Sequence, residues 1–470
     1  MIQATVRELA DWSGAKSIAG NAGDGSARLT GVSTDTRKLR PGQLFVPLRG
    51  ERFDGHDYMA AAIEAGASAA LWDKRTPLPE GAAGIPFLLV DDTLEALQRL
   101  AVSYMDNLSA KVVAVTGSNG KTTTKDLVAS VLATGYRVHK TEGNYNNHIG
   151  MPLTLLAAPA DTEVLVLEMG MSGFGEISRL SRMARPDYAV ITNVGESHLL
   201  QLGSRANIAK AKLEIADGLK PGGTLVMNGD EPLLAAELTA KKLDPSTKLV
   251  TFGEDSGNDW IARYVRVTAD GTQFTAAGEA EQAYELPVPG RHNAINALAA
   301  IAIGRLFRLP TDRIAEGLKQ AKMTGMRIER SAARNGAVIL NDAYNASPTS
   351  VRAAIDLVAG LSGYRRRWVV LGDMLELGES EASLHAGIGA YLDEGKADRV
   401  WLYGPLSKHA AAEAAARFSE PGAVRHYEDK AALADDLLGE LGESDLVLVK
   451  ASRGMRLEEV VIALQRGGRE

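Results

Sequence analysis

One short stretch, VVAVTGSNGKTTTKDLVASVLA (residues 112–133), restricts the fold more than any other part of this chain. Four apolar residues of strand length precede a loop with Gly117 and Gly120, which is followed by Lys121, Thr122 and a helical run. Glycines let backbone N–H groups turn inward without a Cβ in the way, and a helix N-terminus adds a positive end. A strand, a glycine loop and a helix in this order predict a phosphate-binding turn.

The loop differs from the common G-x-x-x-x-G-K-[ST] pattern at its first position, where Val115 replaces glycine. We expect Lys121 to reach the terminal phosphates of a nucleotide and the Thr122 hydroxyl to bind Mg²⁺. The expected phosphate-binding residues are Gly117, Ser118, Asn119, Gly120, Lys121, Thr122 and Thr123. A glycine-rich turn with an incidental lysine is the alternative, and the order of strand, loop and helix argues against it.

Apolar runs of strand length recur along the chain, separated by helical stretches. Such runs predict parallel sheets that are covered on both faces. The runs are Val112–Val115, Val164–Leu167, Tyr188–Ile191, Thr224–Met227, Ala337–Leu340, Trp368–Leu371, Arg399–Tyr403 and Leu446–Val449. A chain of 470 residues is long enough for about three domains. We therefore expect an α/β protein with domains at residues 1–91, 92–325 and 326–470.

The composition excludes several classes of protein. A net charge of −7 argues against a nucleic-acid binder that works through a broad basic surface. Cysteine is absent, which excludes disulfides and thiolate chemistry and fits a reducing compartment. No apolar run approaches the roughly 18 residues that a membrane span needs. We expect a soluble, cytoplasmic protein with neither a nucleic-acid partner nor a membrane insertion.

Polar residues stand where the apolar runs end, and in a parallel sheet those ends share one edge. The run 164–167 leads into Glu168, and a buried strand rarely ends in a carboxylate that has no function. The next run leads to Asn193 and His198. We interpret Thr122, Glu168 and His198 as Mg²⁺ ligands, and a loop histidine bonded to the backbone is the alternative for His198.

The nucleotide is expected to be ATP. The guanine-reading N-K-x-D pattern is absent from the sequence, as are the H-R-D and D-F-G motifs of protein kinases. Hydrolysis, phosphoryl transfer to a small molecule and ligation all stay open at this point.

The combination of T-G-x-x-G-K-T-T, a strand ending in Glu and N-x-x-x-x-H resembles the Mur ligase superfamily, whose members are ADP-forming amide ligases that build the peptidoglycan peptide stem. The likeness covers all three regions and is greatest to the MurF branch. It rests on STDTRKLRPGQLFVPLRGERFDGH (33–56), EGNYNNHIGMPLT (142–154), EMGMSGFGEI (168–177), NDAYNASPTS (341–350) and VVLGDMLELGE (369–379). Ser347 departs from that branch, which usually has Asn there.

The resemblance implies a role for each domain. The first would be a small α/β domain that binds the UDP-linked substrate, the second a central P-loop ATPase domain with a parallel sheet, and the third a Rossmann-like α/β domain. The implied reaction joins D-alanyl-D-alanine to UDP-N-acetylmuramoyl-tripeptide through an acyl phosphate, with ATP and two Mg²⁺ ions, in a monomer.

The resemblance also assigns individual residues. Asn293, Asn296 and Asp342 would contact ATP, and Arg327 would move onto its γ-phosphate when the domains close. Lys212 would be carbamylated and would present a carboxylate-like group to the second Mg²⁺, although by itself a lysine on this helical run is more simply a solvated charge. The implied catalytic residues are Lys121, Glu168, His198, Lys212 and Arg327. The implied substrate-binding residues are Ser33, Asp35, Thr36, Arg37, Asn144, Asn146, Asn147, Tyr344 and Asn345.

Two other functions compete with this one. A ligase of the same fold could use a different acceptor, as the diamino-acid-adding branch and folate polyglutamylation do. A nucleotide-dependent switch that hydrolyses ATP slowly and makes no product is the alternative from another class.

Overall fold

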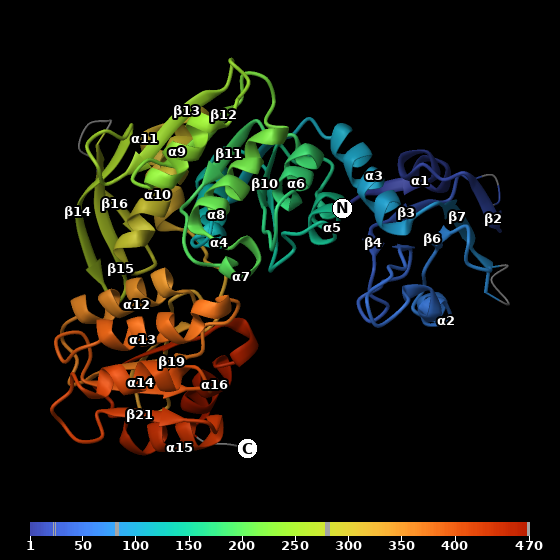
Figure 1. Ribbon diagram of the computed structural model, residues 1–470. Helices are drawn as coiled ribbons and strands as arrows, with labels where there is room; N and C mark the ends of the chain where they lie inside the picture. Colours follow the sequence, from blue (N-terminus) through green and yellow to red (C-terminus); the bar gives the residue numbers. More distant parts are fainter. Residues whose placement is uncertain (22, 24, 80–83, 278–282, 468–470) are drawn as a thin grey trace.

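Three α/β parts follow one another along the chain in the computed structural model, which describes residues 1–21, 23, 25–79, 84–277 and 283–467 (Figure 1). The N-terminal part lies beside the middle part, and the C-terminal part, orange to red in Figure 1, lies against the middle part's lower end in that view. The α/β class expected from the sequence is confirmed. The exact domain boundaries stay a prediction.

The middle part is built on one large sheet with the strand order β16-β15-β14-β13-β12-β11-β8-β10-β9. Its strands are β8 (Lys111–Thr116), β9 (Val138–Lys140), β10 (Val164–Glu168), β11 (Tyr188–Ile191), β12 (Thr224–Asn228), β13 (Lys248–Gly253), β14 (Trp260–Thr268), β15 (Gly271–Ala277) and β16 (Ala283–Leu286). Pairing is parallel from β9 to β14, which confirms the expected parallel sheet. The antiparallel strands β15 and β16, which extend its edge, were not predicted.

Successive residues of the central strands enter two different cores, because side chains of a strand alternate between the faces of the sheet. Val113 and Val115 of β8 pack with α4 and α10, whereas Val112 and Ala114 pack on the opposite side. The helices are α3 (Thr93–Asp106), α4 (Lys121–Ala133), α5 (Gly150–Ala157), α6 (Glu176–Ala184), α7 (Leu199–Leu202), α8 (Arg205–Leu213), η3 (Glu214–Gly218), α9 (Pro232–Ala240), α10 (Arg291–Leu306) and α11 (Thr311–Lys319). Both faces are therefore covered, as a parallel sheet requires.

The C-terminal part has the strand order β17-β18-β22-β19-β20-β21, and all of its pairs except β17 with β18 are parallel. The strands are β17 (Glu329–Ala332), β18 (Val338–Asp342), β19 (Arg367–Gly372), β20 (Arg399–Tyr403), β21 (Val424–Tyr427) and β22 (Leu446–Lys450). The helices are α12 (Pro348–Gly360), η4 (Gly378–Ser380), α13 (Glu381–Tyr391), α14 (Ser407–Ala415), α15 (Lys430–Glu440), η5 (Arg453–Met455) and α16 (Glu458–Arg466). Separate apolar clusters cover its two faces.

The N-terminal part contains a small sheet of order β2-β7-β6-β5-β4 and the pair β1-β3. Its elements are β1 (Gln3–Thr5), α1 (Val6–Ser13), β2 (Ser17–Gly20), β3 (Arg28–Thr30), β4 (Val32–Ser33), β5 (Leu44–Phe45), η1 (Gly55–Tyr58), α2 (Met59–Glu64), β6 (Ala69–Asp73) and β7 (Pro86–Val90). Leu9 of α1, Leu97 of α3 and Leu155 of α5 belong to one apolar cluster, so the N-terminal and middle parts share a core.

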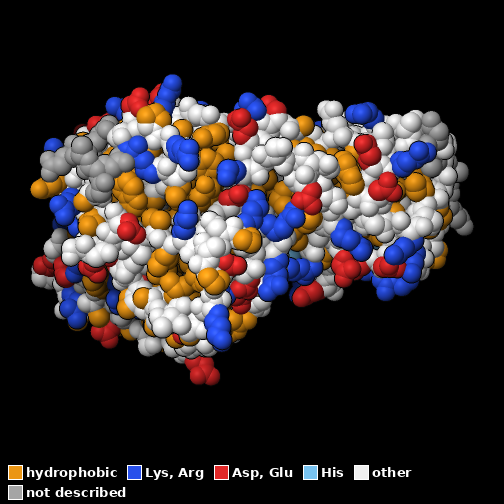
Figure 2. Space-filling view, turned by 90° about the horizontal axis from the view of Figure 1, so that it is seen from above, with side chains coloured by type: hydrophobic (Ala, Val, Ile, Leu, Met, Phe, Trp, Pro, Cys, Tyr) orange, Lys and Arg blue, Asp and Glu red, His pale blue; other side chains and the backbone are white. Residues whose placement is uncertain are grey.

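The surface carries charges of both signs. On the face shown in Figure 2, Lys and Arg side chains are interspersed with Asp and Glu side chains. Among the described residues, no helix has the length and apolar character that a membrane crossing would need.

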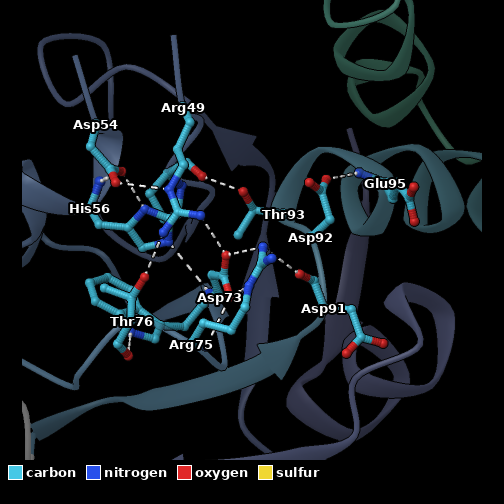
Figure 3. A network of polar contacts seen from close by, with 12 residues as sticks. Arg49, Asp54, His56, Asp73, Arg75, Thr76, Asp91, Asp92, Thr93 and Glu95 are labelled. Carbon is cyan, nitrogen blue, oxygen red and sulfur yellow. Dashed lines mark hydrogen bonds and ion pairs between the residues drawn. The ribbon is translucent and has the colours of Figure 1, made fainter.

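A network of ion pairs holds the N-terminal sheet to the loop that precedes η1 (Figure 3). The Asp73 side chain, which is only 2% exposed, accepts hydrogen bonds from the guanidinium groups of Arg49 and Arg75, each with a contact of 2.7 Å. Arg49 also donates to Asp54, which accepts from the ring of His56. Burial alone would raise the pKa of Asp54, but hydrogen bonds from His56 and Arg49 lower it to about 2. The network therefore stays ionised and intact well into acid.

We expect Asp73→Asn to lower the free energy of unfolding of the N-terminal part by about 2 kcal/mol, because two guanidinium groups lose their charged acceptor. The matched control is Asp91→Asn, whose half-exposed carboxylate pairs with Lys74 at the surface and should contribute nothing measurable. Urea unfolding, combined with hydrogen–deuterium exchange of β6 and β7, measures the difference. Equal losses in the two variants would show that the network does not stabilise this sheet.

Candidate active site

The loop between β8 and α4 turns so tightly that two of its residues can only be glycine. Gly117 has φ = 150°, and a Cβ added there would lie 1.9 Å from the Thr192 hydroxyl. Gly120 has φ = 77°, and a Cβ there would lie 2.8 Å from Oδ1 of Asn296. Both conformations are rare for residues with a side chain. The two glycines bring the loop against β11 on one side and α10 on the other.

Asn193, at the carboxyl end of β11, fixes the loop through its amide group. Its Oδ1 accepts from the Asn119 backbone N–H at 2.9 Å, and its Nδ2 donates to the Asn119 carbonyl at 3.0 Å. The Thr192 hydroxyl donates to the same carbonyl at 2.6 Å. The sequence pattern placed Asn193 at this edge but gave it no role, and the structure shows that it shapes the loop.

Lys121 begins α4 and folds back over the loop. Its ammonium donates to the carbonyls of Gly117 at 2.8 Å and Ser118 at 3.1 Å. Burial lowers the pKa of Lys121, the charge of Glu168 raises it, and the charge of Arg327 lowers it again. An anion near the loop would compete for this ammonium, since the carbonyls are neutral acceptors.

Thr122 and Glu168 place two oxygens side by side at the edge of the sheet. The Thr122 hydroxyl donates to Oε2 of Glu168 at 2.7 Å, and Asn146 donates to Oε1 at 2.9 Å. The Glu168 side chain is buried, so both of its oxygens are fixed. A hydroxyl and a carboxylate are ligands that Mg²⁺ prefers, and this oxygen pair fits such an ion. Within the described ranges no group of three or more His, Asp or Glu residues could hold a metal by itself.

His198, at the N-cap of α7, and Lys212 of α8 lie near the same edge. Burial and the nearby charges of Lys212 and Lys121 lower the pKa of His198 to about 4, so its imidazole is neutral at pH 7. Burial lowers the pKa of Lys212 well below its usual 10.5, and the Lys121 charge lowers it further. The Lys212 side chain is 1% exposed, and its Nζ has no hydrogen-bond partner among the described residues. It is therefore not the solvated helix charge that the sequence alone would favour.

The C-terminal part contributes residues that face the phosphate loop from the other side of the site. Asp342 ends β18 and accepts a hydrogen bond of 2.6 Å from Lys450, which ends the neighbouring β22 and also donates to the Asn345 carbonyl. The guanidinium of Arg327 stacks 4.2 Å from the ring centre of Tyr344. Arg327 lies in the connection between α11 and β17, which joins the middle and C-terminal parts, so its position depends on how these two parts are arranged.

Most of these groups line one cavity of about 440 Å³ between the middle and C-terminal parts. The predicted residues that it brings together are Ser118, Asn119, Gly120, Lys121, Thr122, Thr123, Asn146, Asn147, Glu168, His198, Asn293, Asn296, Arg327, Asp342, Tyr344 and Asn345. Asn293 and Asn296 are buried side chains of α10, and Asn293 donates to the Pro289 carbonyl at 2.8 Å.

The remaining predicted residues lie outside this cavity lining. Gly117 belongs to the loop but does not line the cavity, Lys212 is a buried residue of α8, and Asn144 lies in an exposed turn. Ser33, Asp35, Thr36 and Arg37 form a turn in the N-terminal part, where Asp35 pairs with the exposed Arg37 at 2.9 Å and the Ser33 hydroxyl donates to the Asp35 carbonyl. That turn is therefore separate from the cavity between the middle and C-terminal parts.

Lys450 and His292 are among the cavity residues to which the sequence analysis assigned no role. Lys450 ends an apolar strand, and that position was a usable signal because Glu168 was found in the same way. His292, in the first turn of α10, lies near Asp342, and burial lowers its pKa. No spacing rule points to His292, because it becomes part of the site only when α10 packs beside β18.

Comparison with known proteins relates this geometry to a family. Three family descriptions match successive stretches: "Mur ligase family, catalytic domain" matches residues 28–105, "Mur ligase middle domain" matches 115–304, and "Mur ligase, glutamate ligase domain" matches 326–453.

Individual relatives match along nearly the whole chain. A UDP-N-acetylmuramoyl-tripeptide–D-alanyl-D-alanine ligase of Bacillus subtilis strain 168 is 50% identical over 461 residues, which is 98% of each chain. A crystal structure of MurF from Acinetobacter baumannii superposes with a TM-score of 0.86 at 29% identity and 99% coverage of both chains. MurF ligase from Thermotoga maritima in complex with ADP gives a TM-score of 0.81 at 29% identity, covering 93% of this chain and 97% of its own. The chain belongs to the Mur ligase family.

Proposed function

We propose that this protein is the ATP-dependent, ADP-forming ligase that joins D-alanyl-D-alanine to UDP-N-acetylmuramoyl-tripeptide in the cytoplasmic synthesis of peptidoglycan precursors. The observation that carries the proposal is the 50% identity to a ligase of this name over 98% of both chains. Because the identity extends over 98% of both chains, it includes all three parts of the molecule and therefore the surfaces that would bind each substrate. The protein would act as a monomer.

The middle part would bind the phosphates of ATP. Loop residues Ser118–Thr123 line the cavity, and the Lys121 ammonium and the N-terminus of α4 suit a polyphosphate. Thr122, Glu168 and His198 would hold Mg²⁺, which would neutralise the charge that develops on the transferred phosphoryl group. Asn293 and Asn296 of the middle part and Asp342 of the C-terminal part line the cavity where the nucleoside would rest.

The tripeptide carboxylate would attack the γ-phosphorus of ATP and yield an acyl phosphate and ADP. Lys121 and Arg327 would stabilise the charge on the phosphoryl oxygens during that step. The amine of D-alanyl-D-alanine would then attack the activated carbonyl, and phosphate would leave from the tetrahedral intermediate. Water would hydrolyse the acyl phosphate, so the walls contributed by the middle and C-terminal parts serve to exclude it.

The peptide substrates would enter from the side of the N-terminal part. The UDP portion would bind at the turn formed by Ser33, Asp35, Thr36 and Arg37. Asn144, Asn146 and Asn147 would read amide groups of the tripeptide, since an asparagine side chain offers both a donor and an acceptor. Tyr344 and Asn345 would face the incoming dipeptide or the adenine.

The first prediction from this function concerns the acceptor. Incubation with ATP, Mg²⁺ and UDP-N-acetylmuramoyl-tripeptide should release phosphate in step with amide formation only after D-alanyl-D-alanine is added, because the acyl phosphate needs an amine to react with. Lysine, diaminopimelate and glutamate should each give no product by mass spectrometry. Product with one of these amines would assign the chain to another ligase branch, and steady phosphate release without product would favour the nucleotide-dependent switch.

The second prediction concerns Glu168. Glu168→Gln keeps an acceptor for the Thr122 hydroxyl but removes the negative charge, so kcat should fall by about 10²–10³-fold. The matched control is Glu163→Gln, which changes a half-exposed glutamate just before the same strand and should leave kcat unchanged. Steady-state ADP release measures both variants. Near-normal turnover by Glu168→Gln would contradict the proposed metal site.

The third prediction concerns Lys212, which we propose is carbamylated. A neutral, buried amine adds CO₂ to give a carbamate and a proton, and the product anion would balance the nearby Lys121 charge. After incubation with ¹³C-bicarbonate, the protein should show a carbamate carbon resonance that disappears in Lys212→Ala. Lys210→Ala, which removes an exposed lysine from the same helix, should retain the resonance. An unmodified wild-type protein would exclude the carbamate.

A further inference from the structure

A short segment of the middle part, residues 196–200, touches the C-terminal part at three successive points. It follows β11 and leads into α7, which lies at the end of the middle part that faces the C-terminal part (Figure 1). Glu196 contacts Thr349, His198 contacts Glu376, and Leu200 packs against Gly378. The same five residues therefore include a predicted Mg²⁺ ligand and a contact between domains.

The first point joins Glu196 to the N-terminus of α12. Its Oε2 accepts from the Thr349 hydroxyl at 2.7 Å and from the Thr349 backbone N–H at 3.3 Å. A carboxylate at this end of a helix is favoured by the exposed N–H groups and by the helix dipole. Beside it, the Ser347 hydroxyl donates to Oδ1 of Asn119 in the phosphate loop at 3.0 Å. The start of α12 is thus held to the middle part by two independent side-chain contacts.

The second point joins His198 to Glu376. Oε2 of Glu376 lies 3.2 Å from Nδ1 of His198, although the approach is oblique and Nδ1 makes no full hydrogen bond within the described part of the chain. Both residues have φ = 65°, a left-handed conformation that is uncommon for residues other than glycine. Such conformations persist where the surroundings impose them, and they concentrate at functional sites. The backbone on each side of this contact is shaped to bring the two side chains together.

The third point is the contact between Leu200 and Gly378, which is so close that the two segments have little room to move relative to each other. Gly378 has φ = 68°, and a Cβ added there would lie 3.1 Å from Cδ1 of Leu200. The loop that carries Glu376 is therefore packed directly on the start of α7. A shift of the C-terminal part would move Glu376 away from His198 and Thr349 away from Glu196 together.

We propose that residues 196–200 are the docking point of the C-terminal domain, and that Glu376 is a positioning residue that orients the His198 imidazole when the domains close. A histidine that binds a metal through one ring nitrogen commonly has its other nitrogen held by a carboxylate, which fixes the ring. Here that carboxylate comes from the other domain. The metal site would therefore be complete only in the closed molecule, and ATP would be activated only after closure excludes water.

The role given to Glu376 assumes the proposed function, but it can be tested without the peptide substrates. The Mg²⁺ dependence of ADP binding, measured by calorimetry, reports the positioning role. Glu376→Ala should raise the Mg²⁺ concentration for half-maximal binding about tenfold. Glu376→Gln, which keeps an acceptor for Nδ1–H, should recover most of that loss. The control Glu379→Gln, on an exposed residue of the same loop, should match the wild type.

Small-angle X-ray scattering with ADP and Mg²⁺ reports the docking role. Thr349→Val removes the hydroxyl donor and should increase the radius of gyration, whereas Thr349→Ser keeps the donor and should remain compact. A Glu376→Ala protein with the Mg²⁺ dependence of Glu379→Gln would overturn the positioning role, and a Thr349→Val protein as compact as the wild type would overturn the docking role. Neither result depends on ligation, so a failure of the proposed activity would be recognised separately.

Discussion

The close approach of the phosphate loop to β11 is the constraint on which the rest of the site depends. Gly117 passes so near Thr192 that any side chain would collide with it, and Asn193 then fixes the next turn of the loop from both sides. That arrangement determines where α4 begins, and hence where Lys121 and Thr122 point. It also places Asn119 where Ser347 of the C-terminal domain can reach it. The loop is therefore the reference point for the nucleotide and for the second domain alike.

Much of the fold could be predicted because the central strands are buried on both faces. A strand covered on both sides must be apolar throughout, so Tyr188–Ile191 and Arg399–Tyr403 were predicted with the bounds that the structure gives them. The strands β14 and β15 were not predicted, because their exposure alternates and they present no continuous apolar run. The same reasoning assigned a role to Glu168 at its strand end but assigned none to Lys450, although Lys450 also ends a buried strand.

The site could be predicted less completely, because side chains from separate strands and helices meet only after packing. The sequence places Lys212 on a helix but contains no sign that this helix face is buried beside the cavity. Ser347 looked like a simple departure from the family, yet its hydroxyl caps α12 and contacts the phosphate loop at once. Contacts across the domain boundary, such as those of Glu196 and Glu376, join residues more than 150 positions apart and follow no local pattern.

The charges around the cavity indicate what its walls are built to hold. Among the described residues, Lys121 donates only to loop carbonyls, and the Arg327 guanidinium stacks on Tyr344 with its Nε unpaired. The Lys212 amine, whose pKa burial lowers, has no hydrogen-bond partner in that part of the chain either. Glu168 is a buried carboxylate whose charge acts on both Lys121 and Lys212, and its oxygens are already engaged by Thr122 and Asn146. Buried cations that protein carboxylates do not neutralise destabilise a fold unless an anion compensates them. A polyphosphate would supply that compensation, and a carbamate on Lys212 would supply more of it. The same charges that would bind ATP would therefore also make its binding stabilise the closed arrangement of the middle and C-terminal domains.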